Sequence, residues 1–219
     1  MLALGPGRAY NGGMNRLASL LKRSFVTSAL VALVGCAPRL YDDSSKETGE
    51  PAPFEPPVNS WPVCSEEIPG DLNGVGFSTG DVIPNFSGPD QLGATLALYQ
   101  FYGCITVVDI STMWCAPCQA LAEDVDETAA EYADDGVVYL TVLAQDLEGN
   151  VPDSADLGAW AEGFDITQPI GGDIGEWYRG VVTTNTFPRV ILVGRDMTIL
   201  EADVPATDAE IRAAIESHL

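Results

Sequence analysis

Two cysteines, Cys115 and Cys118, stand three positions apart in the stretch DISTMWCAPCQA, with a proline between them. Thiols at this spacing can bind a metal ion, form an inert structural disulfide, or pass electrons as a dithiol and disulfide couple. The residues before the pair predict a buried strand, and those after it predict a helix. The first turn of a helix favours a thiolate, because its unpaired N–H groups are partly positive. The pattern therefore favours a redox couple in which Cys115 attacks and Cys118 resolves the mixed disulfide.

The chain has five cysteines, an odd number. If residues 104–111 form a strand, its ends lie about 25 Å apart at roughly 3.3 Å per residue. Cys104 would then lie at the far end of the strand from Cys115, which argues against one zinc site shared by four sulfurs. We therefore expect Cys64 and Cys104 to form a structural disulfide that contributes about 3 to 4 kcal/mol. The fifth cysteine, Cys36, lies in the N-terminal region.

Apolar and amphipathic segments alternate along the rest of the chain. The expected strands cover residues 104–111, 137–144, 189–194 and 198–204, the last two as a hairpin. The expected helices cover residues 117–133, 156–164 and 208–218. This β-α-β-α-β-β-α order predicts an α/β fold, in which a central mixed sheet has helices on both faces.

The N-terminal region has the layout of a secretory signal. From Met14 a basic stretch is followed by an apolar run over residues 25–34, then by small residues and Cys36. An apolar run of about ten residues is too short for a membrane-spanning helix, which needs about twenty. Residues 33–36, LVGC, resemble the lipobox of bacterial lipoproteins, in which the cysteine is acylated and becomes the new N-terminus. We expect residues 1–35 to be a signal peptide, with Met14 as an alternative start, and Cys36 to carry lipid. An ordinary cleaved signal is the alternative.

Residues 36–60 are rich in proline, serine and acidic residues and contain little that could pack. Such a composition predicts a semi-extended tether. Ordered structure is expected to begin near Trp61, so residues 61–219 would form one domain with one core. With lipid on Cys36, the tether would hold this domain at a distance from a membrane.

The chain is strongly acidic, with 32 acidic and 10 basic residues and a formal net charge of -22. All four charges in residues 1–35 are basic, so a product that starts at Cys36 keeps six basic residues against 32 acidic ones, a net charge of -26. No basic face remains to neutralise phosphates, which excludes nucleic acid as a partner. A strongly hydrated surface, a salty habitat and attraction to a basic partner all agree with this composition.

Residues 114–118, WCAPC, resemble the active-site motif of the thioredoxin superfamily, as do Asp109 before them and the stretch at 183–200. The likeness covers roughly residues 78–219 and is specifically to exported, membrane-tethered thiol-disulfide oxidoreductases similar to TlpA and ResA. It implies a thioredoxin fold, a monomer in the bacterial cell envelope, and no cofactor or metal. It also implies exchange with exported protein thiols or disulfides and with a membrane or periplasmic redox partner.

The resemblance further implies roles for single residues. Phe187 and Pro188 stand in the place of the family's cis-proline, which faces the active-site disulfide and shapes a groove for an extended substrate. We therefore expect both residues, with Trp114, to contact the substrate. Asp109 stands in the place of a buried acid that accepts the proton of the resolving thiol. The chain has no lysine after Lys46 to stand beside it, so burial without a cationic partner should raise the pKa of this carboxyl.

Other functions agree with parts of the pattern. A peroxiredoxin has a threonine three residues before its peroxidatic cysteine, as Thr112 stands before Cys115, but it also has a proline where this chain has Val108. A copper-delivering protein of the Sco type needs two cysteines four apart and a distal histidine, and the one histidine here is His218 near the C-terminus. A structural surface lipoprotein without redox chemistry is the third alternative.

Overall fold

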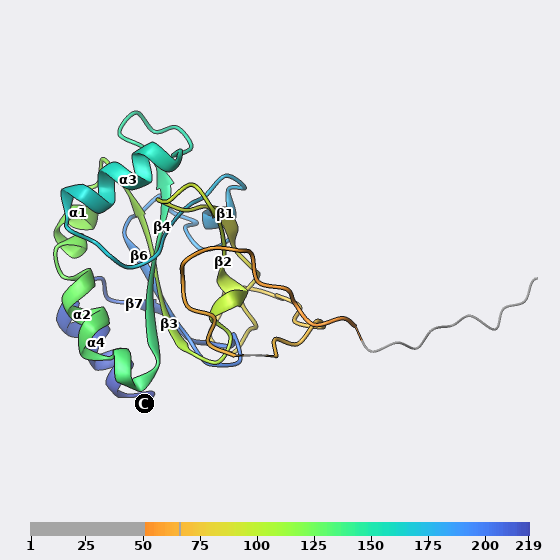
Figure 1. Ribbon diagram of the computed structural model, residues 1–219. Coiled ribbons are helices and arrows are strands. Elements are labelled where there is room, and N and C mark those ends of the chain that lie inside the picture. The colour runs from red at the N-terminus through yellow and green to blue at the C-terminus, as the bar shows by residue number, and fades with distance from the viewer. Residues whose placement is uncertain (1–50, 66) are drawn as a thin grey trace, which may run out of the picture. The chain divides into compact units, whose positions relative to one another are not determined.

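The computed structural model describes residues 51–65 and 67–219 of the chain (Figure 1). The signal peptide predicted at residues 1–35 and the lipid site predicted at Cys36 lie outside the described residues. In the part that is described, no helix is both long enough and apolar enough to cross a membrane.

A five-stranded mixed sheet forms the centre of the domain (Figure 1). In the order β5-β4-β3-β6-β7, its strands are β5 (Ile170–Gly172), β4 (Val137–Gln145), β3 (Ile105–Thr112), β6 (Arg189–Val193) and β7 (Ile199–Val204). β3, β4 and β5 run parallel, whereas β6 runs antiparallel to β3 and forms a hairpin with β7. The predicted α/β class and mixed sheet are confirmed.

β3 and β4 are the most deeply buried strands. Every residue of β3 is buried, and so is every residue of β4 except Gln145. Both are rich in β-branched residues, as is typical of parallel strands that are covered on both faces. Because β3, β4 and β5 share one direction, their carboxyl ends meet at one edge of the sheet, which we call the carboxyl edge.

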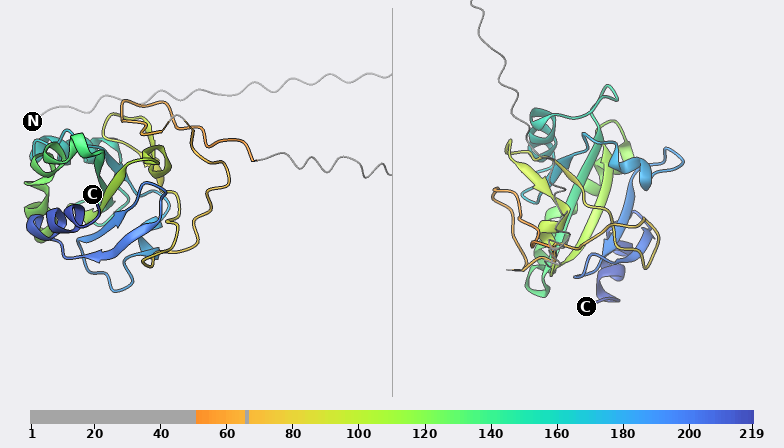
Figure 2. Two further views of the ribbon diagram at one scale, coloured as in Figure 1. Left: turned by 90° about the horizontal axis from the view of Figure 1, so that it is seen from below. Right: turned by 90° about the vertical axis from the view of Figure 1, so that its right-hand side faces the viewer.

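The α-helices are α1 (Ala116–Ala122), α2 (Val125–Glu131), α3 (Ser154–Gly163) and α4 (Asp208–Glu216). The short 3-10 helices are η1 (Leu98–Phe101), η2 (Ala133–Asp135) and η3 (Trp177–Gly180). In Figures 1 and 2, α1, α2 and α4 lie along one side of the sheet, and α3 packs beside β5. The opposite side is covered largely by the β1–β2 hairpin (Ser87–Pro89 and Thr95–Ala97), by η1 and by the chain that leads into them.

The single helix predicted over residues 117–133 is wrong in its extent. The chain forms α1 and α2 instead and turns within residues 123–124. Four carboxylates occur within residues 123–127, and Asp126 and Glu127 lie in the first turn of α2. Carboxylates are favoured at a helix N-terminus and disfavoured toward its C-terminal end. The break therefore suits Asp126 and Glu127, while Glu123 stands at the C-terminal cap of α1.

The sequence also gives no signal for β1, β2 and β5. Each of these strands has three residues, which is too few to show the alternation that marks a strand. β1 and β2 pair with each other, and β5 extends the main sheet beside β4.

The chain packs onto the domain before Trp61, where ordered structure was expected to begin. The ring of Phe54 meets that of Tyr99 edge-on, with the centroids 5.8 Å apart. The indole Nε1 of Trp61 donates a hydrogen bond to Oδ2 of the buried Asp90 at 2.7 Å. The described end of the predicted tether, residues 51–60, thus lies against the domain.

Candidate active site

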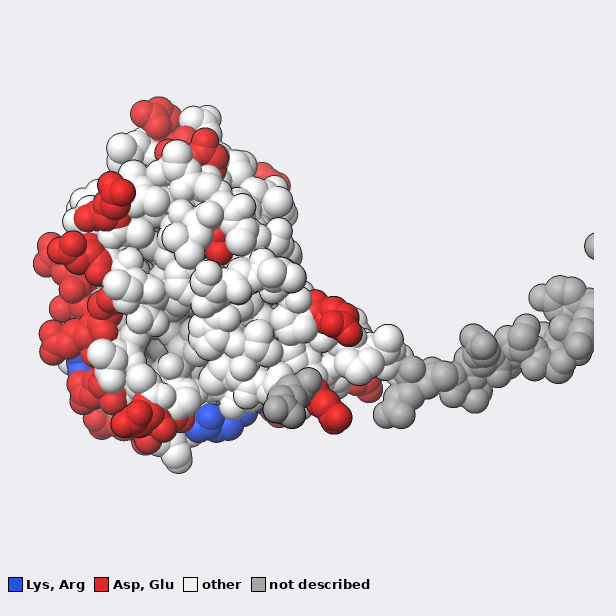
Figure 3. All heavy atoms as spheres, in the orientation of Figure 1, with Lys and Arg blue, Asp and Glu red and all other residues white. Residues whose placement is uncertain are grey.

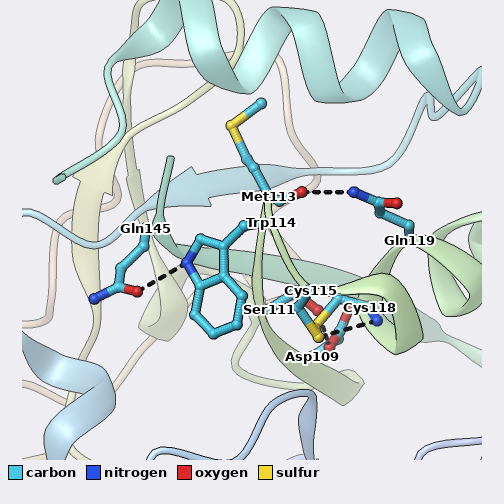
Figure 4. The surroundings of a disulfide bond; sticks show 8 residues. All are labelled: Asp109, Ser111, Met113, Trp114, Cys115, Cys118, Gln119 and Gln145. Carbon is cyan, nitrogen blue, oxygen red and sulfur yellow. Dashed lines mark hydrogen bonds between the residues drawn. A yellow bond between two sulfur atoms is a disulfide. The ribbon is translucent and has the colours of Figure 1, made fainter. Parts of the chain in front are cut away.

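Cys115 and Cys118 are joined by a disulfide at the carboxyl edge, where β3 ends and α1 begins (Figure 4). Cys115 is the N-cap residue of α1 and is 5% exposed, whereas Cys118 is fully buried at 0%. The backbone N–H of Met113 donates to the backbone oxygen of Gln145 at 3.0 Å, which attaches the segment after β3 to the end of β4. The structure therefore places Cys115 nearer the solvent and Cys118 behind it.

A backbone donor is directed at the sulfur of Cys115. The N–H of Cys118 points at Sγ of Cys115 from 3.3 Å. In the reduced protein, this donor and the other unpaired N–H groups of the first turn would stabilise a thiolate on Cys115. Pro117 lies in this first turn, where its missing N–H removes no helical hydrogen bond. The arrangement suits Cys115 as a nucleophile.

Trp114 lies between the end of β4 and the loop before β6. Its Nε1 donates to Oε1 of Gln145 at 3.0 Å (Figure 4), and its ring meets Phe187 edge-on, with the centroids 5.9 Å apart. Gln119 Nε2 donates to the backbone oxygen of Met113 at 2.7 Å and so fixes the segment in front of α1. Trp114 is nevertheless 44% exposed. Its indole is held in place and is open to a bound molecule.

The peptide bond between Phe187 and Pro188 is cis, the geometry that the resemblance implies at this position. Phe187 is buried and packs against Tyr178, with the ring centroids 5.9 Å apart. The buried carboxylate of Asp173 accepts the backbone N–H of Tyr178 at 2.6 Å and that of Trp177 at 2.9 Å. Asp173 therefore positions the segment that supports Phe187. Sequence reasoning missed it, because a lone loop aspartate has no spacing that marks it.

Asp109 lies within β3 and is 1% exposed. Burial raises the pKa of this carboxyl to about 7, and a hydrogen bond from Ser111 opposes the rise. The hydroxyl of Ser111 donates to Oδ1 of Asp109 at 2.8 Å. The carboxyl thus titrates where it can exchange protons near neutral pH, as expected for a buried aspartate without a cationic partner. Sequence reasoning found Asp109 but not its partner Ser111.

A second disulfide joins Cys64 to Cys104, whose Cα atoms are 5.7 Å apart. Cys104 directly precedes β3, so this disulfide lies at the start of the strand whose other end leads to Cys115. The N–H of Cys64 also donates to the backbone oxygen of Gln100 at 3.4 Å. The pair attaches the N-terminal segment to the start of β3, and it is the pairing that the strand geometry predicts.

Exposed apolar side chains follow the carboxyl ends of three neighbouring strands. Trp114 comes after β3, Leu147 and Val151 lie in the loop after β4, and Ile174 comes after β5. The last three are 62%, 53% and 60% exposed, respectively. We call these four residues the apolar row. Exposed apolar side chains at the edge of the sheet that carries the disulfide can form part of a surface that binds another molecule.

Solved structures of other proteins share this architecture at low sequence identity. The thioredoxin domain of a thiol-disulfide oxidoreductase from Bacteroides vulgatus is 21% identical over 64% of this chain and 96% of that chain, with a TM-score of 0.55. A thiol:disulfide interchange protein from a Bacteroides species is 19% identical over 64% and 89%, with a TM-score of 0.55. A thioredoxin-family thiol:disulfide interchange protein from Chlorobium tepidum is 15% identical over 68% and 98%, with a TM-score of 0.53. These likenesses confirm the thioredoxin fold.

No curated protein matches the chain significantly. The model of the AhpC/TSA family, in contrast, matches residues 79–201. The matched region contains β3, the disulfide of Cys115 and Cys118, and the cis-proline Pro188. Because this match covers more than half of the 219 residues, the chain belongs to the AhpC/TSA family.

Proposed function

We propose that the chain is a thiol-disulfide oxidoreductase that exchanges electrons with protein substrates through Cys115 and Cys118. One observation carries the proposal: the two cysteines form a disulfide at the start of α1, with a backbone N–H directed at the sulfur of Cys115. Such a pair can alternate between dithiol and disulfide, and both electrons of the reaction reside on its sulfurs. The reaction therefore requires no cofactor.

In the reducing direction, the thiolate of Cys115 attacks one sulfur of a substrate disulfide, and the other substrate sulfur leaves as a thiolate. Cys118 then loses its proton and attacks the sulfur of Cys115 in the mixed disulfide, which releases the second substrate thiolate. Asp109, whose pKa burial raises to about 7, accepts the proton of Cys118. The substrate has gained two electrons and the enzyme holds the Cys115–Cys118 disulfide. The same steps in reverse oxidise a substrate dithiol.

The apolar row supports a protein substrate. A small disulfide needs only access to Cys115, whereas a polypeptide around a cysteine can cover exposed side chains such as Trp114 and Leu147. The loop that ends in Phe187 and Pro188 lies beside Trp114 and offers backbone along which an extended segment could pair. The substrate class that we propose is therefore a cysteine-containing segment with apolar neighbours.

We further propose that the protein acts outside the cytoplasm, in the bacterial cell envelope. The support comes from the signal pattern of residues 1–35, the lipobox-like residues ending at Cys36 and the tether that follows. The structural disulfide between Cys64 and Cys104 agrees with an oxidising compartment. The substrates would then be exported protein thiols or disulfides, and the redox partner a protein of the membrane or periplasm.

A thiol peroxidase is the second candidate. Thr112 stands three residues before Cys115, as in peroxiredoxins, and its buried hydroxyl has no hydrogen-bond partner among the described residues. The oxidoreductase is favoured over it because Cys118 already serves as a disulfide partner only three positions away. Copper binding has less support. The one histidine, His218, lies near the C-terminus, and its Nε2 is 3.2 Å from Oε1 of Glu201.

Two assays on one preparation separate the candidates. In the presence of dithiothreitol, the wild-type protein should accelerate the reduction of insulin disulfides, and Cys115→Ser should abolish the acceleration. Consumption of hydrogen peroxide by the same preparation should be slow. Rapid peroxide consumption without insulin reduction would favour the peroxidase and contradict the proposal.

A matched pair of variants tests the protein substrate. Leu147→Asp places a charge in the apolar row and should slow insulin reduction roughly tenfold, equivalent to about 1.4 kcal/mol of lost contact. It should leave the reduction of oxidised glutathione unchanged, because that small disulfide does not need the row. Val75→Asp is the control, since Val75 is 67% exposed but lies outside the row. Equal rates for both variants would exclude the row from substrate binding.

A further inference from the structure

The carboxyl group of Asp109 has one hydrogen-bond partner among the described residues, the hydroxyl of Ser111. We propose that Ser111 is a positioning residue for proton transfer, whose buried hydroxyl holds and stabilises the Asp109 carboxylate that takes the proton of Cys118. This inference rests on the proposed function and assigns a role that the cysteine motif itself does not reveal.

The two side chains are brought together by strand geometry. Ser111 follows Asp109 by two positions on β3, so both side chains project from the same face of the sheet. Their exposed fractions are 0% and 1%, respectively, and the donor and acceptor oxygens are 2.8 Å apart. Figure 4 shows both side chains on the strand that leads into the Cys115–Cys118 disulfide. Because both side chains are buried, the hydroxyl of Ser111 provides the hydrogen bond that water would provide to an exposed carboxylate.

β4 carries no cation that could pair with Asp109. The partner of Asp109 on β4 is Thr141, and Tyr139 lies two residues earlier on the same face. Burial and the negative charge of Asp109 raise the pKa of Tyr139 well above its usual value, so this phenol stays neutral. The charges that act on Tyr139 from the N-terminal ends of α2 and α4 are those of the carboxylates Asp124 and Asp208. Arg212, the one cation of these two helices, pairs with Asp208 at 2.7 Å.

The other neighbouring elements also lack a cation that faces Asp109. Its partner on β6 is Val190. Arg189, one residue earlier, projects from the opposite face, and its guanidinium pairs with Asp203 at 2.8 Å. The first helix contributes Cys118, which is uncharged in the disulfide. Among the described residues, the hydroxyl of Ser111 is thus the group placed to stabilise the carboxylate.

A hydroxyl that donates to a carboxyl oxygen stabilises the ionised form more than the protonated form, because hydrogen bonds to charged acceptors are stronger. Without this donor, Asp109 would ionise at a higher pH. Less carboxylate would then be present at pH 7 to accept the proton of Cys118. Attack by Cys115 on a substrate would not change, since that step does not use Asp109.

The first measurement follows the titration of Asp109 by carbon NMR in oxidised protein labelled at the aspartate carboxyls. Ser111→Ala should raise the midpoint of Asp109 by about one to two pH units, the usual effect of a hydrogen bond to a charged group. Thr106→Val is the matched control, because Thr106 is also a buried hydroxyl on β3 but has no hydrogen-bond partner among the described residues. It should leave the midpoint unchanged.

The second measurement follows the release of a mixed disulfide from Cys115 by stopped flow. Ser111→Ala should slow release about fivefold to fiftyfold at pH 7, in line with the smaller fraction of ionised Asp109, and should approach the wild-type rate near pH 9. Asp109→Asn should stay slow at both values of pH. A defect of packing alone would slow Ser111→Ala at every pH.

Three results would overturn the inference. They are an unchanged titration midpoint of Asp109 in Ser111→Ala, an equal shift of that midpoint in Thr106→Val, and slow release in Ser111→Ala that does not recover at high pH. Failure of the proposed function looks different. In that case the variant Cys118→Ser, which cannot release an adduct, would form no mixed disulfide at Cys115, whereas the NMR titration would still report on the contact between Ser111 and Asp109.

Discussion

Asp109 is a carboxyl group inside a strand whose residues are all buried. Burial raises the pKa of this group from 3.8 to about 7. Because the pKa of Asp109 is higher in the folded protein than in the unfolded chain, the protonated carboxyl favours the folded state. This contribution to stability is fully present below the pKa of the unfolded chain. That contribution is lost as the pH rises through the pKa of the folded protein. Ionised Asp109 therefore weakens the folded state above neutral pH, which is expected of a residue kept for chemistry rather than for stability.

The substitution Asp109→Asn tests this energetic cost. Asparagine keeps the shape and carries no charge at any pH, so the variant and the wild type should be about equally stable near pH 4. At pH 8 the variant should be more stable by about 4 kcal/mol, the free energy that corresponds to a shift of about three pH units. Urea unfolding of the oxidised proteins measures the difference.

The matched control is Asp71→Asn, which removes an exposed carboxyl. It should give no difference from the wild type that grows with pH. If Asp109→Asn and the wild type differ by the same amount at pH 4 and pH 8, Asp109 is not the buried titrating group described above.

Residues with a fixed spacing could be predicted from the sequence, and residues that act through a contact could not. The cysteines and Pro188 belong to a motif, and Asp109 has a set distance from it. Other residues contribute through hydrogen bonds, namely Ser111, Gln145 and Asp173. The partners of these bonds are placed by the folded structure, in part by segments that are far apart in the sequence. The sequence around Ser111 does not indicate that its hydroxyl faces the carboxyl of Asp109.

At the scale of elements, β3 connects the two disulfides. Its start adjoins the bond between Cys64 and Cys104, and its end leads to the bond between Cys115 and Cys118. The first bond closes a loop between residues 40 positions apart, so it constrains the unfolded chain strongly. The second spans three positions and constrains it little. The two disulfides should therefore differ in their effect on stability.

Replacing Cys64 and Cys104 together by serine should lower the free energy of unfolding by about 4 kcal/mol, the loop-closure value for a loop of this length. Insulin reduction by the folded fraction should stay near the wild-type rate, because the active-site pair is at the other end of β3. Urea unfolding and the insulin assay, run on one preparation, measure both effects. Unchanged stability, or lost activity in a protein that is fully folded, would contradict this division of roles.

The long buried strands could be predicted because each carries a continuous apolar run between turns. The break between α1 and α2 could not be predicted from apolar spacing alone, since that spacing continues across residues 121–129. Asp126 and Glu127 agree with a new helix start at this point, because both lie in the first turn of α2. β1, β2 and β5 depend on pairing with chain segments that are distant in sequence, so their own three residues are not informative.

At the scale of the whole molecule, the distribution of charge is the leading feature. Acidic side chains cover the side of the domain formed by α1, α2 and α4, as Figure 3 shows. Arg212 lies among them and pairs with Asp208 at 2.7 Å and with Glu127 at 3.6 Å. A domain with this charge is repelled by anionic lipid surfaces. Association with a membrane would therefore depend on the proposed lipid at Cys36 and not on the domain.

The native protein should start at Cys36, and this residue should carry acyl chains. Several chains on one residue anchor a protein durably, whereas a single chain binds only marginally. The protein should therefore sediment with membranes, and Cys36→Ala should release it into the soluble fraction with its thiol chemistry intact. Mass spectrometry of the native N-terminus provides the direct measurement. An unmodified Cys36, or a start elsewhere in the chain, would contradict the anchor.

The central claim is that Cys115 attacks substrate disulfides and Cys118 resolves the product. Its most direct test is the trapping of a mixed disulfide in the variant Cys118→Ser, followed by peptide mapping. With insulin or oxidised glutathione as substrate, we expect a covalent adduct to accumulate on Cys115 of this variant. The wild type should show almost none, because Cys118 displaces it. The absence of an adduct in Cys118→Ser, or an adduct that forms as readily on Cys118 of Cys115→Ser, would contradict the account.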